Sequence, residues 1–254
     1  MSDLNHALYT IISTIITIGI FVLAQYFIKK DEHKQKFLQA TAIITVLIHY
    51  SSIYVSFFKT GIADVDDSML FPIYPCNVAM WLLLLSSFIK NKNGRFFKVV
   101  AEFTFYLGIV GGVVGIIFNE NYMRTPNLLD WDILKGLLSH STMIIGALYL
   151  AIGKFIKIRV SNVISVIIGL LFLIVDGAVI ITIFKLANLD APNCMYLLEN
   201  PFPSMPNFST LWIGVIAVIV AFIFTSIFEF FALPKEERWY AGISRKLENK
   251  IKHN

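Results

Sequence analysis

Cys76 and His140 are the two residues of this sequence whose types best suit nucleophilic catalysis. Cys76 follows Pro75 at the start of one apolar run, and His140 lies in the polar patch Ser139–Thr142 that opens another. A thiolate is a strong nucleophile, and an imidazole that accepts the thiol proton can generate it. The sequence therefore suggests a Cys-His pair that cleaves an ester through an acyl-Cys intermediate.

The position of Cys76 directly after a proline bears on its reactivity. Proline suits the first position of a helix, because the N–H that it lacks would have no partner there. Cys76 and Asn77 would then lie in the first turn, where the helix dipole favours a thiolate. The N–H groups of Asn77 and Val78 would be free to form an oxyanion hole. The alternative interpretation is that Cys76 is a small buried hydrophobic residue.

Asp176 and His49 are further candidates, because ionisable side chains inside apolar runs are costly in a membrane. Asp176 could orient His140 or His49 and complete a Cys-His-Asp set, could be protonated, or could belong to an ion pathway. An interhelical hydrogen bond worth about 1 kcal/mol explains either residue equally well. Glu102 and Glu229 lie near the opposite helix ends, and we expect them to be structural.

The composition and the length of the apolar runs place these residues in a membrane. The 254 residues are 57% hydrophobic and 15% charged, which is too apolar for an ordinary soluble domain. Runs of about 20 apolar residues cross a bilayer, and the backbone in lipid must satisfy its own hydrogen bonds as a helix. We predict an all-α membrane protein, a bundle of seven helices in a single transmembrane domain, with helices at residues 7–28, 37–57, 73–89, 99–118, 134–153, 160–184 and 208–232 and a basic amphipathic cytoplasmic tail at 234–254.

The basic residues concentrate in alternate loops. Seventeen of the 21 Lys and Arg residues fall in one set of loops and the tail, and the positive-inside rule makes this set cytoplasmic. The N-terminus is then outside and the C-terminus inside. A rise of 1.5 Å per residue places Cys76, His140, His49 and Asp176 roughly 5 to 12 Å below the outer ends of their helices. The sequence thus predicts one polar layer in the outer half of the bundle.

Several other classes of site are not expected. The sequence holds no zinc-binding pattern and no phosphate-binding loop, so we expect no cofactor and no metal. The net charge of +4 is explained by the basic loops, so we expect no nucleic-acid partner. A disulfide between Cys76 and Cys194 would abolish the nucleophile and remains open. A transporter or small-molecule-binding bundle that uses His49, His140 and Asp176 as a proton relay or ligand cage is the alternative function.

Three features resemble a known family. Pro75-Cys76-Asn77 opening the third helix, His140 opening the fifth, and the loop Asn193–Leu197 followed by Pro201 resemble the bacterial YwaF-like membrane proteins and the related transmembrane protein 164 family. The resemblance covers most of the chain and implies a multi-pass protein of the bacterial cell membrane. It implies acyltransferase or hydrolase activity on membrane phospholipids and lysophospholipids, with Cys76 and His140 as the catalytic pair. The supporting or substrate-binding candidates are Asn77, His49, Asp176, Asn193 and Tyr196.

Overall fold

The computed structural model describes residues 2–63, 65, 67–117, 130–200 and 209–241. Within these residues the chain is helical, and seven segments are long and apolar enough to cross a membrane. The predicted fold class and number of spans are therefore confirmed. Phe118, Phe208 and tail residues 242–254 of the predicted elements lie outside the described residues. The helices are α1 (Ser2–Phe27), α2 (Asp31–Thr60), α3 (Asp67–Leu70), α4 (Pro75–Phe88), α5 (Arg95–Ile117), α7 (Trp131–Ile152), α8 (Val163–Leu186) and α9 (Thr210–Ala232), with 3₁₀ turns η1 (Val160–Asn162), η2 (Cys194–Tyr196) and η3 (Lys235–Glu237).

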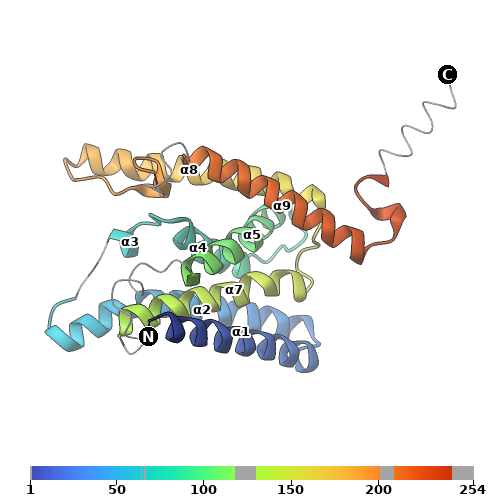
Figure 1. Ribbon diagram of the computed structural model, residues 1–254, viewed down its shortest axis with the longest axis horizontal. Helices are drawn as coiled ribbons and strands as arrows, with labels where there is room; N and C mark the ends of the chain where they lie inside the picture. The colour runs from blue at the N-terminus through green and yellow to red at the C-terminus, as the bar shows by residue number, and fades with distance from the viewer. Residues whose placement is uncertain (1, 64, 66, 118–129, 201–208, 242–254) are drawn as a thin grey trace, which may run out of the picture.

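Four of the helices form a closed ring. Helix α2 packs against α4 and α7, and α5 packs against the same two helices. Helices α4 and α7 therefore face each other diagonally across the bundle. Helix α1 packs on α7, whereas α8 packs on α5 and α9 packs on α8 (Figure 1). Side chains that point inward from α4 and α7 meet at the centre of the ring.

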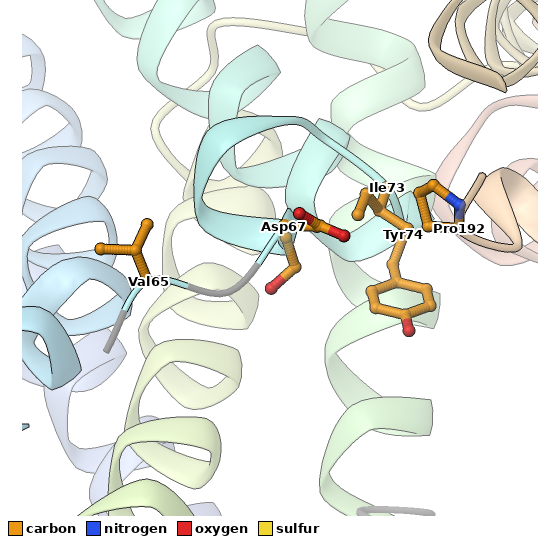
Figure 2. A pocket seen from close by; sticks show the side chains of 6 residues that line it. Val65, Asp67, Ile73, Tyr74 and Pro192 are labelled. Atoms are coloured by element: carbon orange, nitrogen blue, oxygen red, sulfur yellow. The ribbon is translucent and has the colours of Figure 1, made fainter. Parts of the chain in front are cut away.

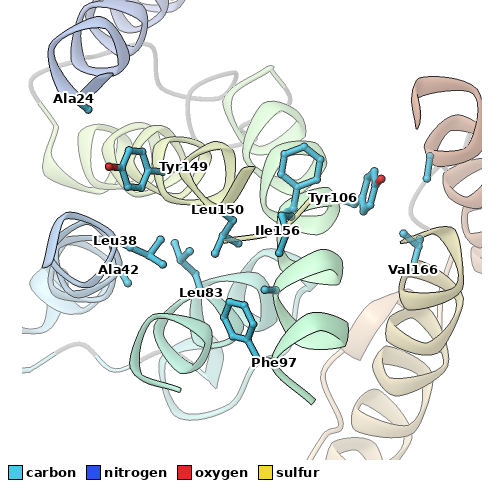
Figure 3. Close-up of a cluster of buried hydrophobic side chains, with 13 residues drawn as sticks. Ala24, Leu38, Ala42, Leu83, Phe97, Tyr106, Tyr149, Leu150, Ile156 and Val166 are labelled. Carbon is cyan, nitrogen blue, oxygen red and sulfur yellow. The ribbon is translucent and has the colours of Figure 1, made fainter. Parts of the chain in front are cut away.

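One end of this ring is filled by apolar side chains. Leu38, Leu83, Phe97 and Tyr149 are buried there together (Figure 3). The helices approach closely, since a Cβ added to Gly146 would lie 2.6 Å from Leu83 Cδ2. Small residues allow such close packing between helices in lipid, where the hydrophobic effect does not drive association. The apolar end therefore holds the ring together by close packing.

The departures of the helices from the predicted boundaries that bear on the site are in the second and third spans. Helix α2 begins at Asp31 and not at Phe37, because an amphipathic, charged segment continues the helix beyond the apolar run. The third span is divided into α3 and α4 by a turn. Helix α4 begins at Pro75, two residues after the predicted start of the span and at the first helical position expected for this proline, and Tyr74 before it is extended with φ −109° and ψ 153°. Proline thus sets the start of the helix that carries Cys76.

Glu102 and Glu229 act as anchors at the apolar end. Glu229 is only 2% exposed, and its carboxylate accepts the backbone N–H groups of Val160 at 2.6 Å and Trp239 at 2.8 Å. Glu102 accepts the hydroxyl of Ser165 at 2.6 Å. Both carboxylates therefore tie neighbouring segments to the bundle, which agrees with the structural role expected for them.

Candidate active site

Helix α5 presents two glycines to the residues that the sequence singled out. Gly111 and Gly115 are four residues apart and lie on the same helix face. A Cβ added to Gly111 would lie 3.7 Å from Cys76 Cα, and a Cβ added to Gly115 would lie 2.2 Å from His140 Nε2. The Cys76 backbone and the His140 ring therefore rest one turn apart on one face of α5, although they come from the diagonal helices α4 and α7.

The His140 ring is held in one tautomer. Its Nδ1 lies 2.6 Å from the carbonyl oxygen of Gly136. A carbonyl only accepts hydrogen bonds, so Nδ1 carries the hydrogen, and Nε2 of the neutral ring is an acceptor. Nε2 is also the ring atom nearest to the position of a Gly115 Cβ. The ring is thus oriented as a base, and it fits because residue 115 has no side chain.

The first turn of α4 differs from the expected oxyanion hole. The N–H groups of Asn77 and Val78 both donate to the carbonyl of Tyr74, at 2.9 and 3.2 Å. The prediction that these two groups are free is therefore wrong, because the residue that caps the helix already accepts their hydrogen bonds. Among the described hydrogen bonds, the N–H of Cys76 has no partner. It is the first-turn amide that remains for an oxyanion.

Asn77 and His49 fix the start of α4 against α2. Asn77 Oδ1 accepts the backbone N–H of Tyr74 at 3.1 Å. The amide nitrogen of Asn77 therefore faces His49 Nε2, 3.4 Å away. Because an amide NH₂ only donates, His49 Nε2 is the acceptor in this contact. His49 therefore contacts the turn that carries Cys76 and helps to hold that turn in place.

Asp176 lies outside the four-helix ring. It belongs to α8, and the adjacent Gly177 packs so closely on η2 that an added Cβ would lie 3.2 Å from the Cys194 carbonyl oxygen. One carboxylate oxygen of Asp176 is buried without a partner among the described residues. The structure therefore does not join Asp176 to His140 as a Cys-His-Asp set or as a relay. Depth along a helix axis, which placed these residues in one layer, does not specify the helix face or the neighbouring helix.

The loop that contains Asn193 and Tyr196 braces the segment before α4. Asn193 Oδ1 accepts two backbone N–H groups of its own loop, at 3.0 Å each. The N–H of Met195 donates to the Ile73 carbonyl at 2.8 Å, and the rings of Tyr196 and Tyr74 are 5.9 Å apart. Met195 and Tyr196 have positive φ angles of 50° and 58°, which are unfavourable for non-glycine residues. The loop thus holds the start of α4 from outside the ring.

Cys194 differs from Cys76 in its exposure and in its place in the fold. Both thiols are free, so the alternative of a disulfide between them is wrong. Cys194 is 0% exposed and lies in η2 outside the four-helix ring, whereas Cys76 is partly exposed and lies in the first turn of α4. A fully buried thiol is less accessible to a substrate than a partly exposed one. Cys76, at a helix N-terminus and beside the glycine face, is the better candidate.

A cavity of about 410 Å³ lies beside the turn that precedes Cys76 (Figure 2). Tyr74 contributes its ring and Asp67 a carboxylate. Neither Cys76 nor His140 lines this cavity, so it is adjacent to the candidate pair and does not contain it. The residues that line it are Val65, Asp67, Ser68, Ile73, Tyr74 and Pro192.

These features define a multi-pass α-helical membrane protein with a cysteine and a histidine brought together inside a four-helix ring. The family can also be stated. A model of the TMEM164 family matches residues 1–230, and the chain belongs to this family. The resemblance to TMEM164 and YwaF-like proteins is thereby confirmed. Comparison with curated proteins and with solved structures gave no match.

Proposed function

We propose that the protein is a phospholipid acyltransferase, or a hydrolase of the same lipids, that works through Cys76 and His140. The observation that carries this proposal is the shared glycine face of α5, where Gly111 and Gly115 lie against the Cys76 backbone and the His140 ring. A nucleophile and a base that are close in space, with the base oriented by a third group, are the signature of covalent acyl transfer. Here the orienting group is the Gly136 carbonyl.

The first half-reaction forms a thioester. His140 Nε2 takes the proton of the Cys76 thiol, and the sulfur attacks the carbonyl carbon of a phospholipid ester. The N–H of Cys76 and the positive end of the α4 dipole stabilise the oxyanion. The ester C–O bond then breaks, His140 returns its proton to the departing oxygen, and a lysophospholipid leaves.

The second half-reaction consumes the thioester. The hydroxyl of a second lysophospholipid gives its proton to His140 Nε2 and attacks the acyl carbonyl. The C–S bond breaks, the proton passes to the sulfur, and a new phospholipid leaves with the Cys76 thiol restored. If water takes the place of the lysophospholipid, the product is a fatty acid, so the access of water to the thioester decides between transferase and hydrolase.

Proton transfer from the Cys76 thiol to His140 requires a hydrogen bond between the two side chains. Cys76 and His140 are not hydrogen-bonded to each other among the described contacts. Catalytic hydrogen bonds are often loose without substrate and tighten when it binds. We therefore expect the thiol and the imidazole to close on each other when a lipid ester enters.

The experiment is acyl exchange by purified protein in vesicles. An isotope-labelled phospholipid serves as donor and an unlabelled lysophospholipid as acceptor, and mass spectrometry follows the labelled acyl chain. We expect Cys76→Ala and His140→Ala each to lower the rate by at least about 100-fold, whereas the matched control Cys194→Ala keeps it. Exchange by Cys76→Ala at the wild-type rate would show that the proposal is wrong.

A further inference from the structure

The segment that leads into α4, residues 67–74, crosses the end of the ring at which α4 begins, and we call it the strap. Figure 1 shows α3, its first part, ahead of the start of α4. Met69 in the strap is 7% exposed, and its carbonyl accepts the hydroxyl of Tyr50 on α2 at 2.7 Å. The ring of Phe71 packs edge to face on Phe184 of α8, with centroids 5.5 Å apart. The strap is therefore fastened to α2 at one point and to α8 at another.

Tyr50 belongs at the same time to the surroundings of the candidate nucleophile. Its ring and Cys76 both pack against the buried cluster of Ala79, Met80 and Met143. One side chain thus contacts the cluster beside the thiol with its ring and holds the strap with its hydroxyl.

The strap also forms a wall of the cavity of about 410 Å³ in Figure 2. Four of the six residues that line this cavity, Asp67, Ser68, Ile73 and Tyr74, belong to the strap. Cys76 follows the strap after a single residue, yet it does not line the cavity. The cavity therefore ends at the strap and does not extend to the thiol.

Exclusion of water has a direct consequence for the proposed reaction. Water can attack the acyl carbonyl of acyl-Cys76 and give its proton to His140 Nε2. The C–S bond then breaks, the proton passes to the sulfur, and a fatty acid leaves. Segments that close over an active site commonly protect a reactive intermediate from such hydrolysis.

We propose that the strap keeps water from Cys76, and that Tyr50, by holding Met69, makes a lysophospholipid and not water the acceptor of the acyl chain. Tyr50 is thus a positioning residue that determines the choice of acceptor. The choice between acceptors rests on the proposed function, whereas the exclusion of water from the thiol does not. One hydrogen bond of this kind changes the equilibrium between a closed and an open strap by a factor of about 2 to 10.

The test compares two thiol reagents on Cys76, in Cys194→Ala protein held in lipid nanodiscs. One reagent is a water-soluble cationic methanethiosulfonate, and the other is a lipid-like thiol-reactive probe. Tyr50→Phe keeps the ring and removes the hydroxyl, so we expect it to raise the rate with the soluble reagent by about 2- to 10-fold and to leave the rate with the lipid-like probe unchanged. The matched control is Tyr54→Phe, at a tyrosine one turn further along α2 that is 65% exposed, and it should alter neither rate. In acyl exchange, Tyr50→Phe should raise the ratio of fatty acid to transferred acyl chain by a similar factor.

Three results would overturn the proposal. An unchanged rate with the soluble reagent in Tyr50→Phe would show that the strap does not exclude water. An equal rise with both reagents would show a general loosening of the bundle. An unchanged product ratio in a protein that transfers acyl chains would show that Tyr50 does not determine the acceptor. Because labelling needs no turnover, faster labelling by the soluble reagent alone, in a protein that transfers no acyl chain, would refute the proposed function and leave the strap standing as a barrier to water.

Discussion

The substitution Gly115→Ala tests whether the shared face of α5 positions the catalytic pair. The added Cβ would lie 2.2 Å from His140 Nε2, whereas ordinary contacts of this kind begin near 3.4 Å. The ring must therefore move by roughly 1.2 Å, or α5 and α7 must separate by a similar amount. Misplacing a reacting group by about 1 Å can cost a factor of about 100 in rate. That factor corresponds to about 2.7 kcal/mol in the activation barrier.

The effect on stability should be much smaller than the effect on rate. Alanine is favoured over glycine inside a helix by up to about 1 kcal/mol. Overpacking costs about 1 to 3 kcal/mol. We therefore expect Gly115→Ala to be destabilised by no more than about 2 kcal/mol and to remain folded.

Two neighbouring glycines provide matched controls. Gly108→Ala creates a comparable overlap at the same interface, with Ala147 Cβ at 2.7 Å, but does not touch the imidazole. Gly111→Ala places its Cβ at 3.7 Å from Cys76 Cα, an ordinary contact. The assay is the rate at which a lipid-like thiol-reactive probe labels Cys76. We expect a loss of about 100-fold in Gly115→Ala and less than about 10-fold in the controls. Labelling of Gly115→Ala at the wild-type rate, or an equal loss in Gly108→Ala, would refute the reasoning.

Three further predictions concern the cap of α4, the buried carboxylate of Glu229 and the buried amine of Lys92. Asn77→Ala removes the cap of α4 and the contact with His49, so thermal unfolding in detergent should show a stability lower by about 1 kcal/mol. The thiol-reactive probe should also label Cys76 more slowly, and unchanged labelling would contradict the role given to Asn77. Glu229→Ala removes a buried carboxylate and leaves the backbone N–H groups of Val160 and Trp239 without their acceptors, so it should cost about 3 kcal/mol. Arg159→Ala removes a partly exposed ion pair of 2.9 Å and should cost less than about 1 kcal/mol; equal costs would contradict this ranking. Burial lowers the pKa of Lys92, in the loop between α4 and α5, to about 8. Above that pH the unfolded chain binds more protons than the folded one, so the free energy of unfolding should rise from about pH 8 to about pH 10. Lys92→Met should lack this rise, and a rise of the same size in that variant would show that Lys92 is not its cause.

The architecture could be predicted because it depends on properties that the sequence displays directly. The length and hydropathy of the apolar runs identify the spans. In lipid a single segment can satisfy its own backbone hydrogen bonds only as a helix. Proline before Cys76 likewise marked the start of α4, because its ring sets φ and it lacks an N–H. The orientation of the termini, with the N-terminus outside, remains a prediction from the charges of the loops.

The arrangement of the site could be predicted only in part. Depth along the helices placed Cys76, His140 and Asp176 in one layer, yet only Cys76 and His140 share the face of α5. Which faces meet depends on the packing of α5 against α4 and α7, and neither spacing nor depth contains that information. The roles of Gly111 and Gly115 were missed for the same reason, although two glycines one turn apart in an apolar run are a signal of close helix contact.

The bracing role of the Asn193–Leu197 loop also could not be read from its motif. Residue types there suggest binding, but the hydrogen bond from Met195 to Ile73 and the contact of Tyr196 with Tyr74 exist only in three dimensions. Likewise Asn77 could be placed in the first turn, but its bond to the Tyr74 N–H decides which way its amide faces.

The acyl-Cys76 thioester is the species that tests the account most directly. Wild-type protein would be exposed to phospholipid without an acceptor, denatured in acid, and measured by intact mass and peptide mapping. The account predicts a mass increase of one acyl chain on the peptide containing Cys76, removable by hydroxylamine, greatly reduced in Gly115→Ala and absent in Cys76→Ala. Acyl transfer without any adduct on Cys76, or an adduct on Cys194 alone, would contradict it.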